Sequence, residues 1–296
     1  MSPGGSQPGG SQHGRPAAPA PEPLPATAFD SHCHLDMIDA PVTEVMAAAA
    51  ACGIDRVVTV GCDLPSSHWA VKCAAGHDDV FAAVAIHPNE TAAAASTPAQ
   101  RDSVLAEISE LAGLPEVRAV GETGLDYYRD DAPPALQREW FRAHIDIAKQ
   151  AGKALMIHDR DAHDDVLAIL AAQGAPDRVV FHCFSGDAAM ARQCADAGYL
   201  LSFAGTLTFA NAPQLREAAV VTPAELLLVE TDAPFLTPAP NRGKSNSPAQ
   251  VAHTLRALAA VKHLDVAELC SVIQLNGERV FGPWSAGPWS AGPWRA

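Results

Sequence analysis

The sequence predicts an α/β fold, a (β/α)8 or TIM barrel in a single domain. Apolar, strand-like runs alternate with helical segments eight times over roughly 250 residues, which is typical of this barrel. The rival is an open doubly wound sheet, which usually carries a glycine-rich phosphate turn after its first strand. Here the first predicted strand ends instead in the segment HCHLD (32–36), which favours the barrel.

The eight strands are predicted from short apolar runs rich in β-branched residues, each bounded by glycine, proline or a polar turn. RVVTVGC (56–62) and RVVFHCF (178–184) are typical examples. The predicted strands are residues 28–35, 56–62, 80–87, 117–121, 154–158, 178–184, 199–203 and 226–231.

The helices are predicted from apolar spacing and from their end signals. Residues 134–151 give the clearest pattern, because Leu136, Trp140, His144 and Ala148 recur at helical spacing and Gly152 follows. The predicted helices are residues 41–52, 65–76, 98–112, 134–151, 162–172, 187–197, 213–220, 248–262 and 266–280.

Two segments flank the predicted barrel domain of residues 28–281. Residues 1–27 are rich in proline, glycine and serine and lack the apolar core of a secretion signal, so we expect a disordered leader. Residues 282–296 nearly repeat Gly-Pro-Trp-Ser-Ala, and such short copies cannot build a core. We expect a low-complexity tail, with a hydrophobic docking tag as the alternative.

Composition limits the location and the partners. No apolar run reaches the roughly 18 residues that a membrane span needs, so no membrane association is expected. The seven cysteines are odd in number and form no CxxC pair, which indicates reduced thiols and a cytoplasmic protein. A net charge of −14 argues against a broad nucleic-acid-binding surface. It leaves room for local phosphate binding, because metal ions can supply positive charge.

The first strand carries a pair of histidines. His32 and His34 are two residues apart, so on a strand they project from the same face, and Cys33 projects from the other. Neutral imidazole is the commonest metal ligand in proteins, although two histidines could equally be surface or cap residues.

Further polar residues stand at the ends of other strands, where a barrel places its chemistry. Taken singly, each carboxylate could be a loop residue or a helix cap, and each histidine a core residue. Together with the histidine pair they would be costly to bury without a cation. Six ligands exceed the four of a tetrahedral ion, so two bridged ions fit better. The additional candidates are Glu122, His158, His182 and Asp232.

Two more residues are expected to contact substrate. Arg160 follows His158 in phase on the same strand and could bind a phosphate, with a surface salt bridge to Asp161 or Asp164 as the alternative. His87 ends the third strand and is placed on the substrate, with a capped loop histidine as the alternative.

On these residues the chain resembles the TatD family of metal-dependent deoxyribonucleases, within the amidohydrolase-like metal hydrolases. The similarity extends through nearly all of residues 28–281, and Ala154 stands where the family usually has proline. The similar segments are FDSHCHLD (29–36), AIHPNE (85–90), GETGLDYYR (121–129), ALMIHDRDAHDD (154–165), HCFSG (182–186), ETDAPFL (230–236) and NGERVF (276–281).

The resemblance implies a binuclear metal site and hydrolysis of DNA, with exonuclease action as the expectation. One metal would be held by His32, His34 and Asp232. Glu122 would bridge to a second metal, which His158 and His182 complete. Family members are usually described as magnesium-dependent, whereas four imidazoles favour zinc or manganese, so all three ions stay open.

Catalysis is expected to use Asp232 and Glu122. Asp232 would orient the attacking water and accept its proton, and Glu122 would serve as the shared metal ligand. The alternative function is hydrolysis of another ester or amide at the same site, such as removal of D-amino acids from tRNA.

Overall fold

The structure is a computed structural model that describes residues 15–283, and within them eight parallel strands form one sheet in chain order. The sheet closes on itself beyond β8, where His34 N donates to Ala233 O (2.7 Å) and Asp232 N donates to His32 O (2.9 Å). The predicted barrel is therefore confirmed. Its strands are β1 (Ala28–Cys33), β2 (Ile54–Val60), β3 (Val80–Val84), β4 (Val117–Asp126), β5 (Ala154–Arg160), β6 (Val179–Phe181), β7 (Leu200–Phe203) and β8 (Leu227–Val229).

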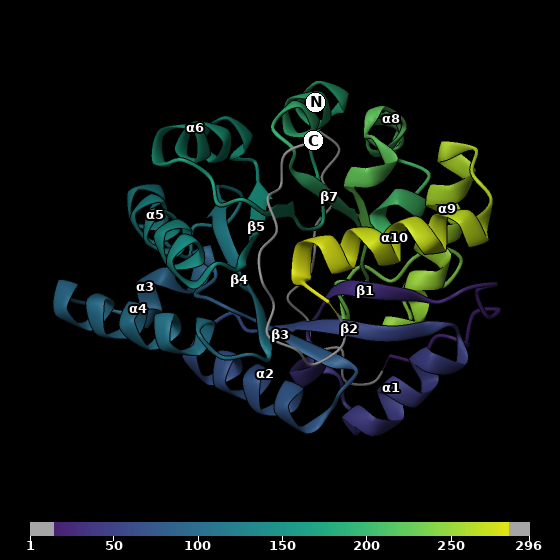
Figure 1. The fold of residues 1–296 in the computed structure, drawn as a ribbon, viewed down its shortest axis with the longest axis horizontal. Helices are drawn as coiled ribbons and strands as arrows, with labels where there is room; N and C mark the ends of the chain where they lie inside the picture. Colours follow the sequence, from purple (N-terminus) through teal and green to yellow (C-terminus); the bar gives the residue numbers. More distant parts are fainter. Residues whose placement is uncertain (1–14, 284–296) are drawn as a thin grey trace.

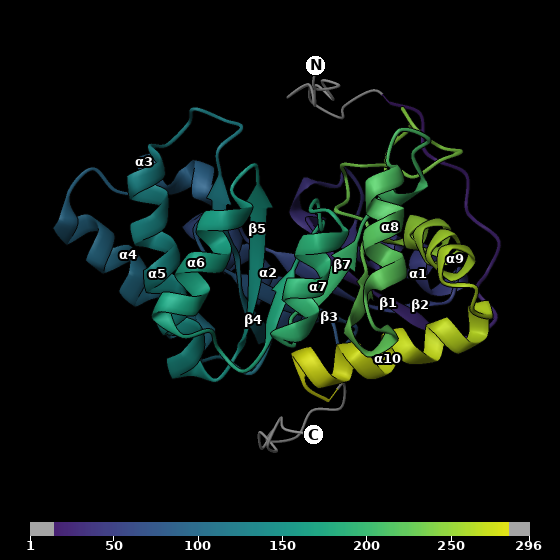
Figure 2. The ribbon, with the colours of Figure 1, turned by 90° about the horizontal axis from the view of Figure 1, so that it is seen from above.

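Helices surround the strands, as Figures 1 and 2 show. Short 3-10 turns η1 to η5 lie in the connections, at Leu35–Met37, Pro88–Glu90, Gly205–Thr208, Ala224–Leu226 and Pro248–Gln250. The helices are α1 (Val42–Ala51), α2 (Leu64–Gly76), α3 (Thr91–Ala94), α4 (Pro98–Ala112), α5 (Pro134–Ala151), α6 (His163–Gln173), α7 (Ala188–Asp196), α8 (Pro213–Val221), α9 (Val251–Lys262) and α10 (Val266–Phe281).

The core lies between the strands and these helices. Helix α5 shows how the sequence pattern produces it: Trp140, Phe141 and Ile145 are each at most 1% exposed and face the sheet side. The helix ends at Gly152, which adopts the left-handed conformation (φ 61°) that glycine tolerates without strain. Burial of this apolar face is the main stabilising contribution to such a helix.

Helix α10 covers the amino-terminal end of the barrel. Figure 2 shows it across the end opposite the arrowhead of β5. Its last carbonyl groups accept hydrogen bonds from arginines beside the starts of two strands: Arg178 donates to Val280 O (2.9 Å) and Arg118 to Phe281 O (3.4 Å). The open mouth is therefore the carboxyl end of the strands.

Strands β4 and β5 are longer than the sequence predicts. They pair as far as Asp126 with Arg160, beyond the expected ends at residues 121 and 158. Glycine at 121 and 124 suggests a strand end, but Gly124 allows a close approach between the strands. A Cβ there would lie 2.0 Å from His158 O, and its φ is +137°. The added length of β4 includes Glu122, which thereby reaches the mouth beside His158.

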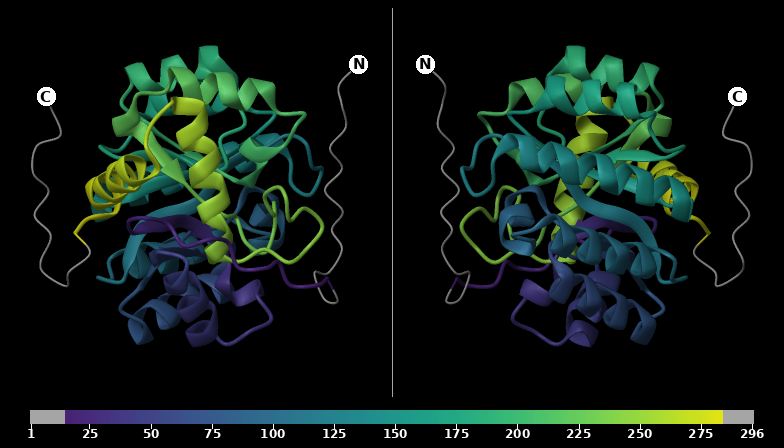
Figure 3. Two further views of the ribbon diagram at one scale, coloured as in Figure 1. Left: turned by 90° about the vertical axis from the view of Figure 1, so that its right-hand side faces the viewer. Right: turned by 90° about the vertical axis from the view of Figure 1, so that its left-hand side faces the viewer.

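Residues 15–27 differ from the expected disordered leader. They run as extended chain beside the loop after β8, as Figure 3 shows, with a bridge between Ala17 and Ser245. Leu24 is 8% exposed, and its backbone N donates to Cys52 O (3.0 Å). Composition does not predict this ordered segment. A proline-rich chain can still accept hydrogen bonds through its carbonyl groups, as Pro19 O does from Gln250 Nε2. Residues 1–14 and the expected tail from 284 onward lie outside the described residues.

No helix among residues 15–283 combines the length and the apolar character that crossing a membrane requires.

Candidate metal centre

All six predicted ligands come together at the carboxyl end of the barrel. His32 lies on β1 and His34 directly after it, Glu122 lies on β4, and His158 lies on β5. His182 directly follows β6, and Asp232 lies three residues beyond β8. Their donor atoms form overlapping groups of three whose members lie within 4.8 Å of one another. The groups are His32–His34–Asp232, His32–Glu122–His182, His34–Cys62–Glu122 and His87–Glu122–His158.

Glu122 is the centre of this cluster and is 4% exposed. Its Oε1 lies 2.7 Å from His182 Nε2 and 2.8 Å from His158 Nδ1. Its Oε2 lies 3.5 Å from His32 Nε2 and 3.8 Å from His34 Nε2. The two oxygens of one carboxylate thus face two different pairs of imidazoles, as a bridging ligand requires.

Asp232 also faces the first histidine pair, and it lies next to β1 because its backbone N donates to His32 O. Its Oδ1 lies 3.5 Å from His34 Nε2 and 3.7 Å from His32 Nε2, and its side chain is 15% exposed. The two imidazole nitrogens are 3.3 Å apart. As predicted, His32 and His34 project together, whereas Cys33 Sγ points away and donates to Val58 O.

Three of the histidines each have one ring nitrogen beside an acceptor that is not one of the six candidate ligands. His34 Nδ1 lies 3.1 Å from Val60 O, and His182 Nδ1 lies 3.2 Å from Glu230 Oε1. His158 Nε2 lies 3.2 Å from Asp126 Oδ2. A proton on each outer nitrogen leaves the inner nitrogen with a lone pair, the arrangement that orients metal-binding histidines.

The charges of the cluster are strongly coupled. Burial opposes ionisation of Glu122, but the facing His182 and His87 hold the pKa of this carboxyl well below its ordinary range. Burial likewise opposes protonation of His182, yet Glu122 and Glu230 raise its pKa well above the ordinary value. Burial, and then His182, lower the pKa of His32. Protons shared in this way are those that a bound cation displaces.

These residues fit a divalent cation. Among residues 15–283, no lysine or arginine forms an ion pair with Glu122 or Asp232, so the basic groups that face the two carboxylates are imidazoles. Borderline nitrogen donors combined with carboxylates suit zinc, manganese and similar ions.

His87 lies nearer the cluster than the sequence suggests. Its Nε2 is 3.5 Å from Glu122 Oε1, and its ring is 4.5 Å from that of His158. Its Nδ1 accepts from Asn89 N (3.1 Å), so the proton of the neutral ring sits on Nε2. His87 therefore presents a donor to the mouth, whereas the other imidazoles can present a lone pair.

Arg160 stands at the rim on β5, in phase with His158. Its guanidinium lies 3.8 Å above the ring of Tyr128, which is 52% exposed. Within the described part of the chain it makes no salt bridge to Asp161 or Asp164, the alternative that its position suggested.

Two residues of the site are missing from the sequence-based set. Cys62 Sγ lies 3.8 Å from Glu122 Oε2, and Glu230 Oε1 accepts from Cys183 N (2.8 Å) beside His182. Both follow an apolar strand closely, which is the signal used for the other ligands. Cys62 was counted only as a reduced thiol, and Glu230 stands next to the more obvious Asp232.

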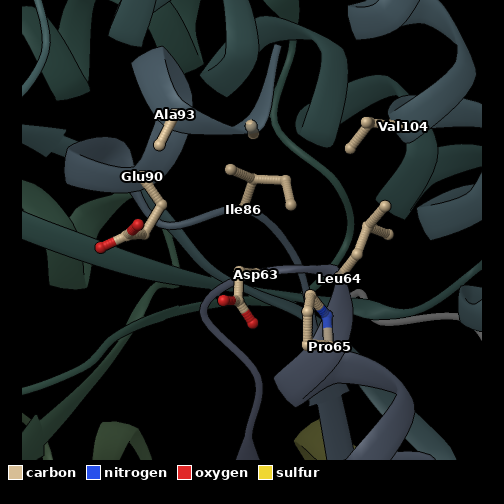
Figure 4. Close-up of a pocket in the computed structure, with 8 residues that line it drawn as sticks. Asp63, Leu64, Pro65, Ile86, Glu90, Ala93 and Val104 are labelled. Atoms are coloured by element: carbon tan, nitrogen blue, oxygen red, sulfur yellow. The ribbon is translucent and has the colours of Figure 1, made fainter.

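Figure 4 shows a pocket of about 240 Å³ whose lining includes Asp63 and Ile86, the neighbours in sequence of Cys62 and His87. It lies between the start of α2 and the segment that contains η2 and α3, and Ile86 and Val104 contribute apolar lining. Asp63 and Glu90 are its acidic residues. Two carboxylates make this pocket unfavourable for a polyanion.

A closed parallel barrel with clustered imidazoles and carboxylates at its carboxyl mouth defines a metal-hydrolase type of protein. A model of the TatD-related DNase family matches residues 29–282, and the chain belongs to this family of metal-dependent hydrolases.

Named relatives and a solved structure agree with this assignment. "Uncharacterized metal-dependent hydrolase TatD" of Mycobacterium tuberculosis is 49% identical over 262 residues, covering 86% of this chain and 97% of the relative. "Uncharacterized metal-dependent hydrolase YabD" of Bacillus subtilis is 39% identical, covering 86% and 98%. The crystal structure of YJJV, a TatD homologue from Escherichia coli, superposes with a TM-score of 0.80 at 25% identity, covering 86% and 98%.

Proposed function

We propose that this protein is a divalent-metal-dependent deoxyribonuclease that removes nucleotides from DNA ends or single strands. The observation that carries the proposal is the position of Glu122 between two sets of imidazoles, with Asp232 across the same mouth. This arrangement supports two ions with Glu122 as the shared ligand. One ion would use His32, His34 and Asp232, and the other His158 and His182.

Bound divalent ions would lower the pKa of water and neutralise charge on the phosphate oxygens. Zinc, manganese and magnesium remain the candidates, and the imidazole count favours the first two.

The chain's own residues would position the water and the substrate. Burial opposes ionisation of Asp232, but the facing His34 and His32 hold its pKa below the ordinary value. The carboxylate is thus ready to orient a water and accept its proton. The fork of donors on Arg160 fits a phosphate, and the Nε2–H of His87 fits a phosphate oxygen.

Two further parts of the proposal rest on composition. The net charge of −14 favours binding of one end of the substrate over contact with many phosphates along a duplex. All seven cysteines lie in the described range and are free, which supports a reducing cytoplasmic location.

The test is cleavage of 3′-labelled single-stranded DNA by the full chain with magnesium, manganese or zinc, beside a metal-free sample. We expect product only with metal, and none from Asp232→Asn with an unchanged circular dichroism spectrum. D-aminoacyl-tRNA serves as the parallel substrate. If the protein hydrolyses that ester and leaves the DNA uncleaved, the deacylase function replaces the deoxyribonuclease function. If Asp232→Asn cleaves DNA at the wild-type rate, the proposed role of Asp232 is wrong.

A further inference from the structure

Cys62 brings a thiol to the metal centre. The residue follows β2 and is half-buried, and its Sγ lies 3.8 Å from Glu122 Oε2, the oxygen that faces His34 Nε2 at 3.8 Å. These three residues form one of the four groups whose donor atoms lie within 4.8 Å of one another. Sulfur is therefore available beside the nitrogen and oxygen donors of the site.

The backbone holds this thiol in place. Cys62 N donates to Ser66 Oγ (2.9 Å), and Cys62 O accepts from His87 N (2.8 Å). The preceding residue must be glycine, because a Cβ on Gly61 would lie 2.5 Å from the backbone of Ser67. The chain thus turns tightly from β2 toward α2, and this turn sets Cys62 at the mouth.

Sulfur is a different kind of donor from the nitrogen and oxygen atoms that surround it in this group. Thiolate is a soft ligand that selects zinc and similar ions, whereas magnesium prefers oxygen donors. A coordinated thiol is deprotonated outright, since the metal takes the place of the proton.

We propose that the Cys62 thiolate is a ligand for the cation that lies between Glu122 Oε2 and His34 Nε2, and that it makes this centre prefer zinc or cobalt to magnesium. As the sulfur–metal bond forms, the thiol proton leaves to solvent, so no oxidant or reductant is involved. The inference rests on the metal centre of the proposed function and is independent of whether the substrate is DNA.

The experiment is a cobalt(II) titration of the metal-stripped full chain without oxygen, followed by absorption spectroscopy. We expect visible ligand-field bands together with a near-ultraviolet sulfur-to-cobalt charge-transfer band. Cys62→Ser and Cys62→Ala should lose the charge-transfer band and keep the visible bands. Cys183→Ser is the matched control, because it removes the thiol beside His182 and should keep both.

Competition between metals gives the second readout. Loss of the thiolate should weaken zinc binding by more than about tenfold and leave magnesium binding within about threefold. Visible bands without the charge-transfer band in the wild type, or a charge-transfer band that persists in both Cys62 variants, would overturn the sulfur ligand alone. A chain that binds no cobalt would overturn the metal centre as well.

Discussion

At the scale of single residues, the partner of one ring nitrogen decides what a buried histidine can do. His34 and His182 have their outer nitrogens beside Val60 O and Glu230, so their inner nitrogens are available to a cation. His144 on α5 is equally buried, but Ile86 N donates to its Nε2 (3.3 Å) and its Nδ1 lies 2.8 Å from Thr123 Oγ1. Both of its nitrogens are used, so His144 is a structural residue.

His144 should make stability depend on pH. Burial lowers its pKa to about 3, whereas an unfolded chain has about 6.5. Below pH 6.5 the unfolded chain binds a proton that the folded chain does not, so stability falls as pH drops from 6.5 toward 3. Between pH 7 and pH 5 the free energy of unfolding of the wild type should fall by about 2 kcal/mol more than that of His144→Gln.

Urea unfolding at the two pH values measures this difference, and titration of the metal ligands cancels in the comparison. The side-chain oxygen of glutamine can still accept from Ile86 N. His68→Gln replaces an exposed histidine and should behave as the wild type. Equal losses in the wild type and His144→Gln would contradict the assignment.

At the scale of elements, the apolar runs predict the strands well, because a parallel strand covered on both faces must be apolar. Strand ends are harder to predict from the sequence. Gly121 and Gly124 suggest a turn, yet β4 continues to Asp126 because it pairs with β5 to the end. Neither the length of this pairing nor the fit of residues 15–27 on the barrel can be derived from local composition.

The segment before β1 should contribute to stability through Leu24. This side chain is 8% exposed and packs with Gly53, whose added Cβ would meet Leu24 Cβ at 3.0 Å. Leu24→Ala should lower the free energy of unfolding by about 2 kcal/mol. Leu275→Ala, at a leucine that is 61% exposed, should change it by less than about 0.5 kcal/mol. Denaturant unfolding midpoints of the two variants measure these changes. If Leu24→Ala destabilises the protein as little as Leu275→Ala does, Leu24 contributes no packing.

At the scale of the whole molecule, the two ends of the barrel have separate tasks. Helix α10 covers one end, and the candidate centre occupies the other, where the six ligand side chains from β1, β4, β5, β6 and β8 or their following residues meet. An acidic protein with this arrangement can attract a polyanion only locally, at the metal centre and at Arg160.

Binding of DNA should therefore depend weakly on salt. Each phosphate contacted on a single strand contributes about 0.7 to the slope of log affinity against log salt, so we expect a slope of about 1 in KM. Arg160→Met should reduce this slope, whereas Lys262→Met, at the far side of the barrel beside Thr222 O, should not. A slope of several units that survives Arg160→Met would indicate an extended DNA track instead.

The local pattern of the chain is enough to predict the order of the eight strands, the barrel and the residue types at its mouth, since alternation and apolar character are local properties. The same pattern identified six of the residues that meet there. Only the tertiary structure decided which nitrogen of each imidazole faces inward, and that Cys62 and Glu230 join the centre. The physical reason is that these features depend on contacts between distant positions, such as His182 with Glu230, which lie 48 residues apart.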